Sequence, residues 1–136
     1  MRFPYRGAGV LLVCGSRFLV GCRAKTPFKG RWAMPGGGRE KGETDTRTAV
    51  REFREETGTD FDSIKNKEFL GQWRLRLPFF CWTSFIYRVD KEIATKPSEF
   101  SELVWLDADA IMQKKLRPFF RSELKTACRL AGLNSN

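Results

Sequence analysis

Apolar residues occur in short runs separated by turn-forming residues along the first part of the chain. Residues 9–14 and 18–22 are almost wholly apolar, and Gly15-Ser16 lies between them. Two such runs joined by a short turn predict a β-hairpin, with strands near 8–14 and 17–23. A loop rich in lysine, glycine and proline follows over residues 25–42. Further strands are expected near 67–75, 80–89 and 102–106, with Pro78 in the turn between the first two.

Helical periodicity occurs in two segments. Residues 45–57 carry small and apolar side chains at the spacing of one helical face, namely Thr46, Ala49, Val50 and Phe53. Thr44 or Asp45 is the expected N-cap, and Gly58 stands where a left-handed residue ends a helix. From residue 107 onward the pattern is helical, with Pro118 as the first residue of the last helix. The apolar positions of that helix are expected to pack on the sheet: Phe119, Leu124, Ala127 and Leu130. Together these elements predict an α+β or α/β fold with a mixed sheet.

Composition narrows the class of protein and its chemistry. The 136 residues contain no repeat or linker, which predicts a single domain over residues 1–136. Hydrophobic residues make up 41% and charged residues 30%, as in folded soluble proteins. Histidine is absent, which excludes a Ser-His-Asp triad and an HExxH zinc helix. The chemistry must therefore use carboxylates, lysines, hydroxyls, thiols or a metal held by oxygen.

Cysteine spacing and the lengths of the apolar runs bear on location. The four cysteines are too far apart for a CxxC motif and stand among apolar residues, so we expect reduced thiols in a cytoplasmic protein. Arg2 and Arg6 before an apolar run imitate a signal peptide, but the run is short and lacks a cleavage site. No stretch is long enough to span a membrane. Monomer and homodimer both remain open.

Charge is unevenly distributed along the chain. The net charge is +9, yet residues 42–110 hold ten basic and fourteen acidic side chains between two basic flanks. An acidic middle between basic flanks indicates a cation-binding site beside an anion-binding surface. The alternative interpretation is a generally basic surface without a specific partner.

Three glutamates gather on the helix predicted over residues 45–57. Glu52, Glu55 and Glu56 follow the i, i+3, i+4 spacing of one face, where like charges repel. A divalent cation bound between them would remove that repulsion, and oxygen ligands suit Mg²⁺ or Mn²⁺. The alternative is a solvated acidic face neutralised by arginines of the same helix: Arg47, Arg51 and Arg54.

The segment before this helix adds a glycine loop. Pro35-Gly36-Gly37-Gly38 allows backbone groups to approach a phosphate or a metal closely. The loop leads to a helix N-terminus, which favours anions. Arg51 lies one turn before Glu55, so the two side chains can pair.

These residues resemble the Nudix box, which reads G-x5-E-x7-R-E-U-x-E-E-x-G-U with U bulky and apolar. The matching positions over residues 37–59 are Gly37, Glu43, Arg51, Glu52, Phe53, Glu55, Glu56 and Gly58. The last U position departs from the pattern, because it holds Thr59. The flanks are similar as well, with Arg23 closing the second predicted strand and Gly30, Trp32 and Pro35 before the box.

The resemblance implies a Nudix fold, an α/β/α sandwich with a mixed sheet between helices. It also implies Mg²⁺-dependent hydrolysis of a nucleoside diphosphate linked to another moiety, with Mn²⁺ as a substitute. Glu52, Glu55 and Glu56 would be metal ligands, helped by the carbonyl of Gly36 or Gly37. Arg51 would orient a carboxylate, and Glu43 would be a further ligand or a loop anchor.

Hydrolysis of a pyrophosphate linkage without histidine needs a carboxylate or a metal-bound hydroxide as the base. Glu56 is a candidate, and the resemblance adds a later loop, where Glu99 and Glu102 stand just before Trp105. Ordinary surface charge is the alternative interpretation of Glu99 and Glu102.

Substrate contacts are less well marked. Arg23 is the first candidate for binding phosphate, and further basic residues flank the glycine loop: Lys25, Lys29, Arg31 and Arg39. The backbone of Gly37 and Gly38 can approach a phosphate closely. Phe80 is a candidate for stacking on a base. The other aromatic candidates are Phe28, Trp32, Phe79 and Trp82. In an alternating strand, however, half of the side chains must face inward.

Three substrate classes remain open. Chain length resembles the MutT-type members, which favours cleavage of (d)NTP to (d)NMP and pyrophosphate. A nucleotide-sugar or dinucleotide pyrophosphatase would use the same metal site. RNA is the third class, as a 5′-end pyrophosphohydrolase or a binding protein, and is indicated by the net charge and the basic residues of the last segment: Lys114, Lys115, Arg117, Arg121, Lys125 and Arg129. A pure binding protein is disfavoured, because three carboxylates would repel phosphate.

Overall fold

The computed structural model of the chain describes residues 4–26, 28–96 and 99–133. Its strands are β1 (Tyr5–Cys14), β2 (Arg17–Arg23), β3 (Trp32–Ala33), β4 (Gly36–Gly38), β5 (Glu68–Arg76), β6 (Phe80–Arg88) and β7 (Phe100–Asp107). Its helices are α1 (Asp45–Thr57), α2 (Ala108–Met112) and α3 (Phe120–Leu130), with a short 3₁₀ turn, η1 (Phe61–Ser63). None of the described helices is long and apolar enough to cross a bilayer.

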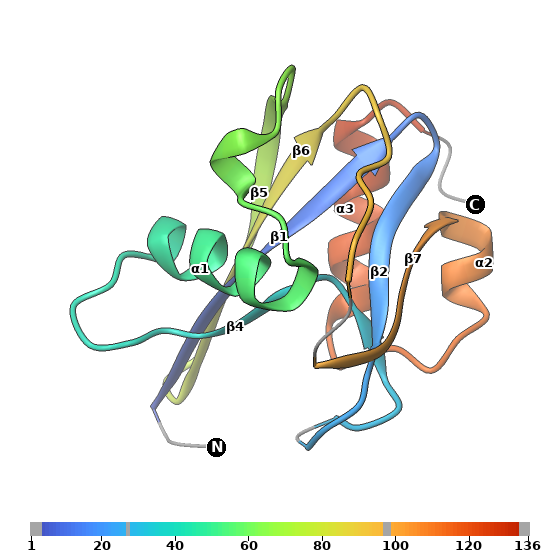
Figure 1. Ribbon diagram of the computed structural model, residues 1–136. Helices are drawn as coiled ribbons and strands as arrows, with labels where there is room; N and C mark the ends of the chain where they lie inside the picture. The colour runs from blue at the N-terminus through green and yellow to red at the C-terminus, as the bar shows by residue number, and fades with distance from the viewer. Residues whose placement is uncertain (1–3, 27, 97–98, 134–136) are drawn as a thin grey trace.

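The strands form one mixed sheet between helices. The order is β3-β2-β1-β6-β5, with β4 also paired to β1 and β7 to β2. β1 runs parallel to β6, and the other pairs are antiparallel. Figure 1 shows α1 on one side of the sheet and α3 on the other. This architecture confirms the predicted α+β fold.

The central strand β1 contributes to both hydrophobic cores, because alternate residues of a strand point to opposite faces. Val10 packs in the core that contains Phe53 of α1. Leu11 packs in the core that contains Leu124 of α3. Both faces of β1 are therefore buried, and α1 is fixed against the middle of the sheet.

Strand β4 lies unusually close to β1, and glycine on both strands makes this possible. A Cβ on Gly9 would lie 2.5 Å from the carbonyl oxygen of Pro35, and one on Gly36 would lie 2.8 Å from that of Ala8. The predicted loop over residues 25–42 therefore contains two short strands, β3 and β4, which the sequence did not indicate. Their pairing holds the glycine loop directly beside α1.

The caps of α1 confirm the sequence prediction, and its buried face corrects it. The hydroxyl oxygen of Thr44 accepts a hydrogen bond from the backbone N–H of Arg47 at 3.2 Å, and Gly58 has a φ of 77°. Thr46 is exposed, contrary to expectation. The buried face of the helix is made instead by Thr48, Ala49, Phe53, Glu56 and Thr57.

The last helix begins later than predicted. α3 starts at Phe120, with Phe119 in the left-handed region at its N-cap, so Pro118 is not its first residue. Residues 113–119 leave the helical path because Trp32 donates a backbone hydrogen bond to Lys115 and accepts one from Arg117. Phe119 is 46% exposed and is not part of the core. The expected packing of the other apolar positions is confirmed, with Leu124 and Ala127 buried and Leu130 partly buried.

The cysteines are free thiols. Cys128 is buried, and the other three are half-buried: Cys14, Cys22 and Cys81. Burial is the largest cause of the raised pKa values of Cys14 and Cys128.

Candidate active site

Glu56, near the end of α1, is a buried carboxylate beside the glycine loop. Its side chain is fully buried, and its Oε1 accepts a hydrogen bond from the backbone N–H of Gly36 at 2.6 Å. Its other oxygen, Oε2, is buried and has no hydrogen-bond partner among the described residues. A buried carboxylate oxygen is costly to leave unpaired, so this atom is suited to coordinate a cation.

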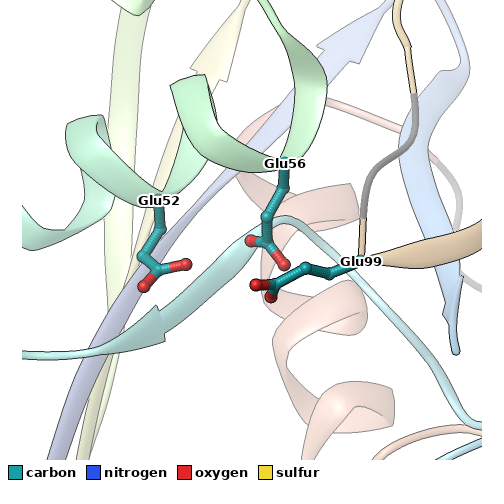
Figure 2. Close-up of side chains that lie close together, drawn as sticks. All are labelled: Glu52, Glu56 and Glu99. Carbon is teal, nitrogen blue, oxygen red and sulfur yellow. The ribbon is translucent and has the colours of Figure 1, made fainter. Parts of the chain in front are cut away.

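Two further carboxylates converge on Glu56. Figure 2 shows Glu52, one turn earlier on α1, and Glu99, from the segment before β7, pointing toward it. One carboxylate oxygen from each of the three residues lies within 4.8 Å of the others. Three carboxylates around a buried, unpaired oxygen form an oxygen-only donor set, which fits a hard divalent cation such as Mg²⁺ or Mn²⁺.

The pKa values of two carboxyls in the cluster, Glu52 and Glu56, are raised. Burial, together with the negative charge of Glu52, raises the pKa of Glu56 to about 9. Burial also raises the pKa of Glu52, with Arg51 opposing the rise. Without a cation, these carboxyls hold their protons more strongly than isolated glutamates do. A bound cation would reverse this effect.

Arg51 of α1 contacts both the glycine loop and the carboxylates of the site. Its guanidinium binds both oxygens of Glu43, at 2.8 and 3.0 Å, and donates to the carbonyl of Gly38 at 2.9 Å. The same group lies 3.0 Å from Glu52 and 3.2 Å from Glu55. Hydrogen bonding to Arg51 is the largest cause that lowers the pKa of Glu43 to about 2. Glu43 therefore anchors the loop, while Arg51 orients Glu52.

The structure shows which of the other candidate carboxylates join the cluster. Glu55 is half exposed, pairs with Arg51, and is not among the three clustered carboxylates. Glu102 is exposed on β7 opposite Cys22 of β2 and does not join the cluster that the described residues form. Glu99, the other candidate from the same segment, does join it.

A cleft of about 240 Å³ opens beside the cluster. Its walls include Glu52, Glu99 and the three glycines of β4. A Cβ on Gly37 would collide with the carboxylate of Glu52. Glycine at this position therefore lets the loop backbone lie directly against the candidate metal ligands.

Several predicted substrate contacts line this cleft and others do not. Arg23, Gly37, Gly38 and Phe80 line it, as do two of the other aromatic candidates, Phe28 and Trp82. Lys25 is exposed and is not part of the lining, and the same holds for the remaining basic candidates: Lys29, Arg31 and Arg39. Trp32 is buried beneath Lys114, and Phe79 is 68% exposed outside the cleft.

Sequence reasoning did not assign four residues to the cleft: Tyr5, Ala33, Met34 and Arg117. Tyr5 stacks on Phe80, with ring centroids 5.3 Å apart, and Met34 forms part of the floor. Arg117 also lines the cleft, although it is buried and paired with Glu123. In the sequence it stands in a basic stretch that resembles a solvated surface. The only indication in the sequence that Arg117 is buried was an acidic residue six positions later, Glu123, with which it pairs.

Comparison with known proteins decides the family. The NUDIX domain model matches residues 4–127. The chain belongs to the Nudix family. An RNA pyrophosphohydrolase from Sphingopyxis alaskensis is 31% identical, and the alignment covers 89% of each chain. Members of the Nudix hydrolase family act on pyrophosphate bonds, and pyrophosphate hydrolysis is accordingly the activity of this chain.

Solved Nudix structures agree in fold. A NUDIX hydrolase from Nitrosomonas europaea superposes with a TM-score of 0.76 at 21% identity, covering 99% of this chain and 77% of that one. A bifunctional NMN adenylyltransferase/ADP ribose pyrophosphatase from Francisella tularensis, complexed with AMP and a Mn ion, has a TM-score of 0.73 at 17% identity. That match covers 92% of this chain and 41% of the other. Nudix hydrolases generally depend on a divalent metal, and the carboxylate cluster described above fits one.

Proposed function

We propose that this Nudix hydrolase cleaves nucleoside triphosphates to nucleoside monophosphate and pyrophosphate with Mg²⁺. The observation that carries the proposal is the placement of the Glu52–Glu56–Glu99 cluster at the edge of an aromatic-lined cleft. A triphosphate would extend along the glycine loop toward the carboxylates while its base lies between the aromatic side chains. Water adds across the linkage between the α- and β-phosphates, and its elements are divided between the two products.

The roles of the chain's own residues follow from their positions. Glu52, Glu56 and Glu99 would hold the cation. A bound cation neutralises phosphate charge and lowers the pKa of the attacking water. Arg51 keeps Glu52 in place, and Arg23, which lines the cleft, is positioned for phosphate. Glu52 and Glu99 line the cleft, whereas Glu56 is fully buried. Because Glu52 is held by Arg51, Glu99 would be the carboxylate that accepts a proton from water.

Product analysis tests this proposal. The protein is incubated with Mg²⁺ and a panel of NTPs, dNTPs, nucleotide sugars and dinucleotides, and products are resolved by anion-exchange chromatography. We expect monophosphate and pyrophosphate, with activity abolished by EDTA and by Glu56→Gln. Monophosphate with a sugar phosphate or a second nucleotide, while triphosphates stay intact, would contradict the triphosphate assignment.

RNA carrying a 5′-triphosphate is the second candidate substrate. The relative from Sphingopyxis alaskensis, named an RNA pyrophosphohydrolase, favours it. Two exposed aromatic side chains also favour it, because Phe119 stacks on Phe80 at the cleft and Phe79 immediately precedes Phe80. Exposed rings of this kind suit the stacking of unpaired bases. A 5′-triphosphorylated oligonucleotide hydrolysed with at least tenfold higher kcat/KM than the matching free NTP would favour RNA over free nucleotides.

A further inference from the structure

Three arginines gather around one small cavity beside the start of α1. Arg6 of β1 and Arg76 of β5 lie on either side of Cys81 of β6, because β6 pairs with both strands at this position. Arg74 stands two residues before Arg76 and therefore points to the same face of the sheet. All three arginines line the cavity, whose volume is about 120 Å³. We call it the arginine cavity.

The positive charge of the arginine cavity is only partly balanced. Asp45, the first residue of α1, is the one acidic side chain among the described residues that line it. Its Oδ2 accepts a hydrogen bond from the hydroxyl of Thr83 at 2.9 Å. The three arginines are exposed, and no ion pair or side-chain hydrogen bond joins them to another residue in the part of the chain that the structure describes. Like charges this close repel each other, and a bound anion would remove that repulsion.

The arginine cavity lies behind the aromatic wall of the cleft. Alternate residues of a strand point to opposite faces. Tyr5 and Phe80 line the cleft, whereas the residues that follow them, Arg6 and Cys81, line the arginine cavity. The turn between β5 and β6 lies beside both at one end of the sheet (Figure 1), where Tyr5 donates a backbone hydrogen bond to the carbonyl of Phe79 at 2.9 Å. Phe79, in this turn, is 68% exposed.

A basic cavity beside an exposed aromatic ring suits single-stranded nucleic acid. Proteins that bind single strands combine basic side chains along the phosphate backbone with aromatic side chains on which the bases stack. Arginine donors match the oxygens of a phosphate. The bases of a duplex are already paired and stacked, so a duplex would use the arginines but not Phe79.

We propose that the arginine cavity binds a backbone phosphate of a single-stranded RNA whose first nucleotide occupies the cleft. The proposal rests on RNA as the second candidate substrate and adds a binding surface outside the carboxylate cluster. A strand that leaves the cleft would pass Phe79 at the turn before it reaches the arginines. A free nucleoside triphosphate has no phosphate on the 3′ side of its sugar, so only a longer chain contacts the cleft and the arginine cavity together.

An oligonucleotide that cannot be hydrolysed tests the surface separately from catalysis. An oligo-uridylate of about 12 nucleotides, with a 5′-hydroxyl and a 3′-fluorescein, is titrated with the protein in EDTA, and fluorescence anisotropy gives Kd. The triple variant Arg6→Gln/Arg74→Gln/Arg76→Gln should bind at least ~10-fold more weakly than the wild type at low salt, because charge-assisted contacts to phosphate are lost. Its Kd should also depend less steeply on salt concentration.

The matched control removes the same charge from a different basic surface. Arg121, Lys125 and Arg129 are exposed on α3, which lies on the other side of the sheet from α1. The triple variant with glutamine at these positions should bind nearly as tightly as the wild type. If the first triple variant fails to fold, Arg74→Gln is compared with Arg121→Gln in the same titration.

Two further measurements place the strand. The half-buried thiol of Cys81 lines the arginine cavity, so bound oligonucleotide should slow its alkylation by iodoacetamide in the wild type, followed by peptide mass spectrometry. Cys14, half-buried at the other end of β1, should react at an unchanged rate. With Mg²⁺, the arginine variant should lose kcat/KM for the 5′-triphosphorylated oligonucleotide and keep it for UTP.

The outcomes are distinguishable. Equal losses of affinity in the two triple variants, a larger loss in the α3 variant, or unchanged alkylation of Cys81 would each overturn the inference. A duplex of the same length that competes as well as the single strand would do the same and would assign the arginines to polyanions in general. If the oligonucleotide binds at the arginines but no triphosphate is hydrolysed, the RNA surface stands and the proposed reaction fails. If triphosphates are hydrolysed but the oligonucleotide does not bind there, the reaction stands and this inference fails.

Discussion

Replacement of Glu56 by glutamine should raise the stability of the metal-free protein at neutral pH while it abolishes metal-dependent activity. The folded-state pKa of Glu56 is about 9, against an ordinary value of 4.5. As pH rises, Glu56 therefore loses its proton first in the unfolded chain. This ionisation favours the unfolded state, so the free energy of unfolding decreases progressively between pH 4.5 and pH 9. At pH 7.5 the difference is three pH units, or about 4 kcal/mol at 1.36 kcal/mol per unit.

Glu56→Gln removes this ionisation and keeps the oxygen that accepts from Gly36. Urea unfolding is followed by tryptophan fluorescence in EDTA from pH 5 to pH 8.5, for the wild type, Glu56→Gln and the exposed control Glu68→Gln. The difference in the free energy of unfolding between Glu56→Gln and the wild type should be smallest at pH 5 and should widen as pH rises. Mg²⁺ at pH 7.5 should stabilise the wild type and leave Glu56→Gln unchanged. Parallel pH profiles in EDTA for the wild type and Glu56→Gln would refute the assignment of a buried, high-pKa carboxyl.

Three further changes address the rest of the site. Gly37→Ala should push the Glu52 carboxylate out of place and lower kcat at least ~10-fold with an unchanged circular dichroism spectrum; wild-type kcat would contradict the close packing. Glu99→Gln should weaken Mg²⁺ binding, measured by calorimetry, far more than Glu102→Gln does, because only Glu99 joins the carboxylate cluster; equal effects would remove Glu99 from the metal site. Arg51→Met should remove the pairing that lowers the pKa of Glu43 to about 2. The pairing stabilises the fold above about pH 4.5, and this stabilisation is lost as pH falls toward 2. The free energy of unfolding of this variant, measured in urea, should therefore fall less steeply with decreasing pH than that of the wild type. An equal slope would contradict the ion pair.

Features set by local sequence were predictable. The Thr44 cap, the length of α1 and the left-handed Gly58 each depend on residues within one or two helical turns, and all three are confirmed. The Nudix spacing fixed the family in the same way. The helical spacing did not show, however, that Glu55 lies outside the cluster that Glu52 and Glu56 join. The directions of these side chains depend on Arg51 and on the glycine loop.

Features set by distant contacts were not predictable. Strand β4 consists of three glycines, whose pairing depends on the absence of side chains at Gly7 and Gly9 of β1. Pro118 would suit the start of a helix, but the backbone bonds between Trp32 and the preceding residues delay the helix to Phe120. Arg117 shows the same limit, since burial of a basic residue is decided by a partner that packs against it.

The parallel pairing of β1 with β6 has a consequence for folding during synthesis. Tyr5 pairs with Phe80 and Val13 with Arg88, so the central strand lacks one neighbour until more than half of the 136 residues have been made. Contacts so distant in sequence slow folding, because a long loop must close before they form. The apolar β1–β2 hairpin therefore leaves the ribosome with two open edges, because β2 also lacks β7 until residues 100–107 have been made. Each open edge can pair with another chain until its partner strand has been made.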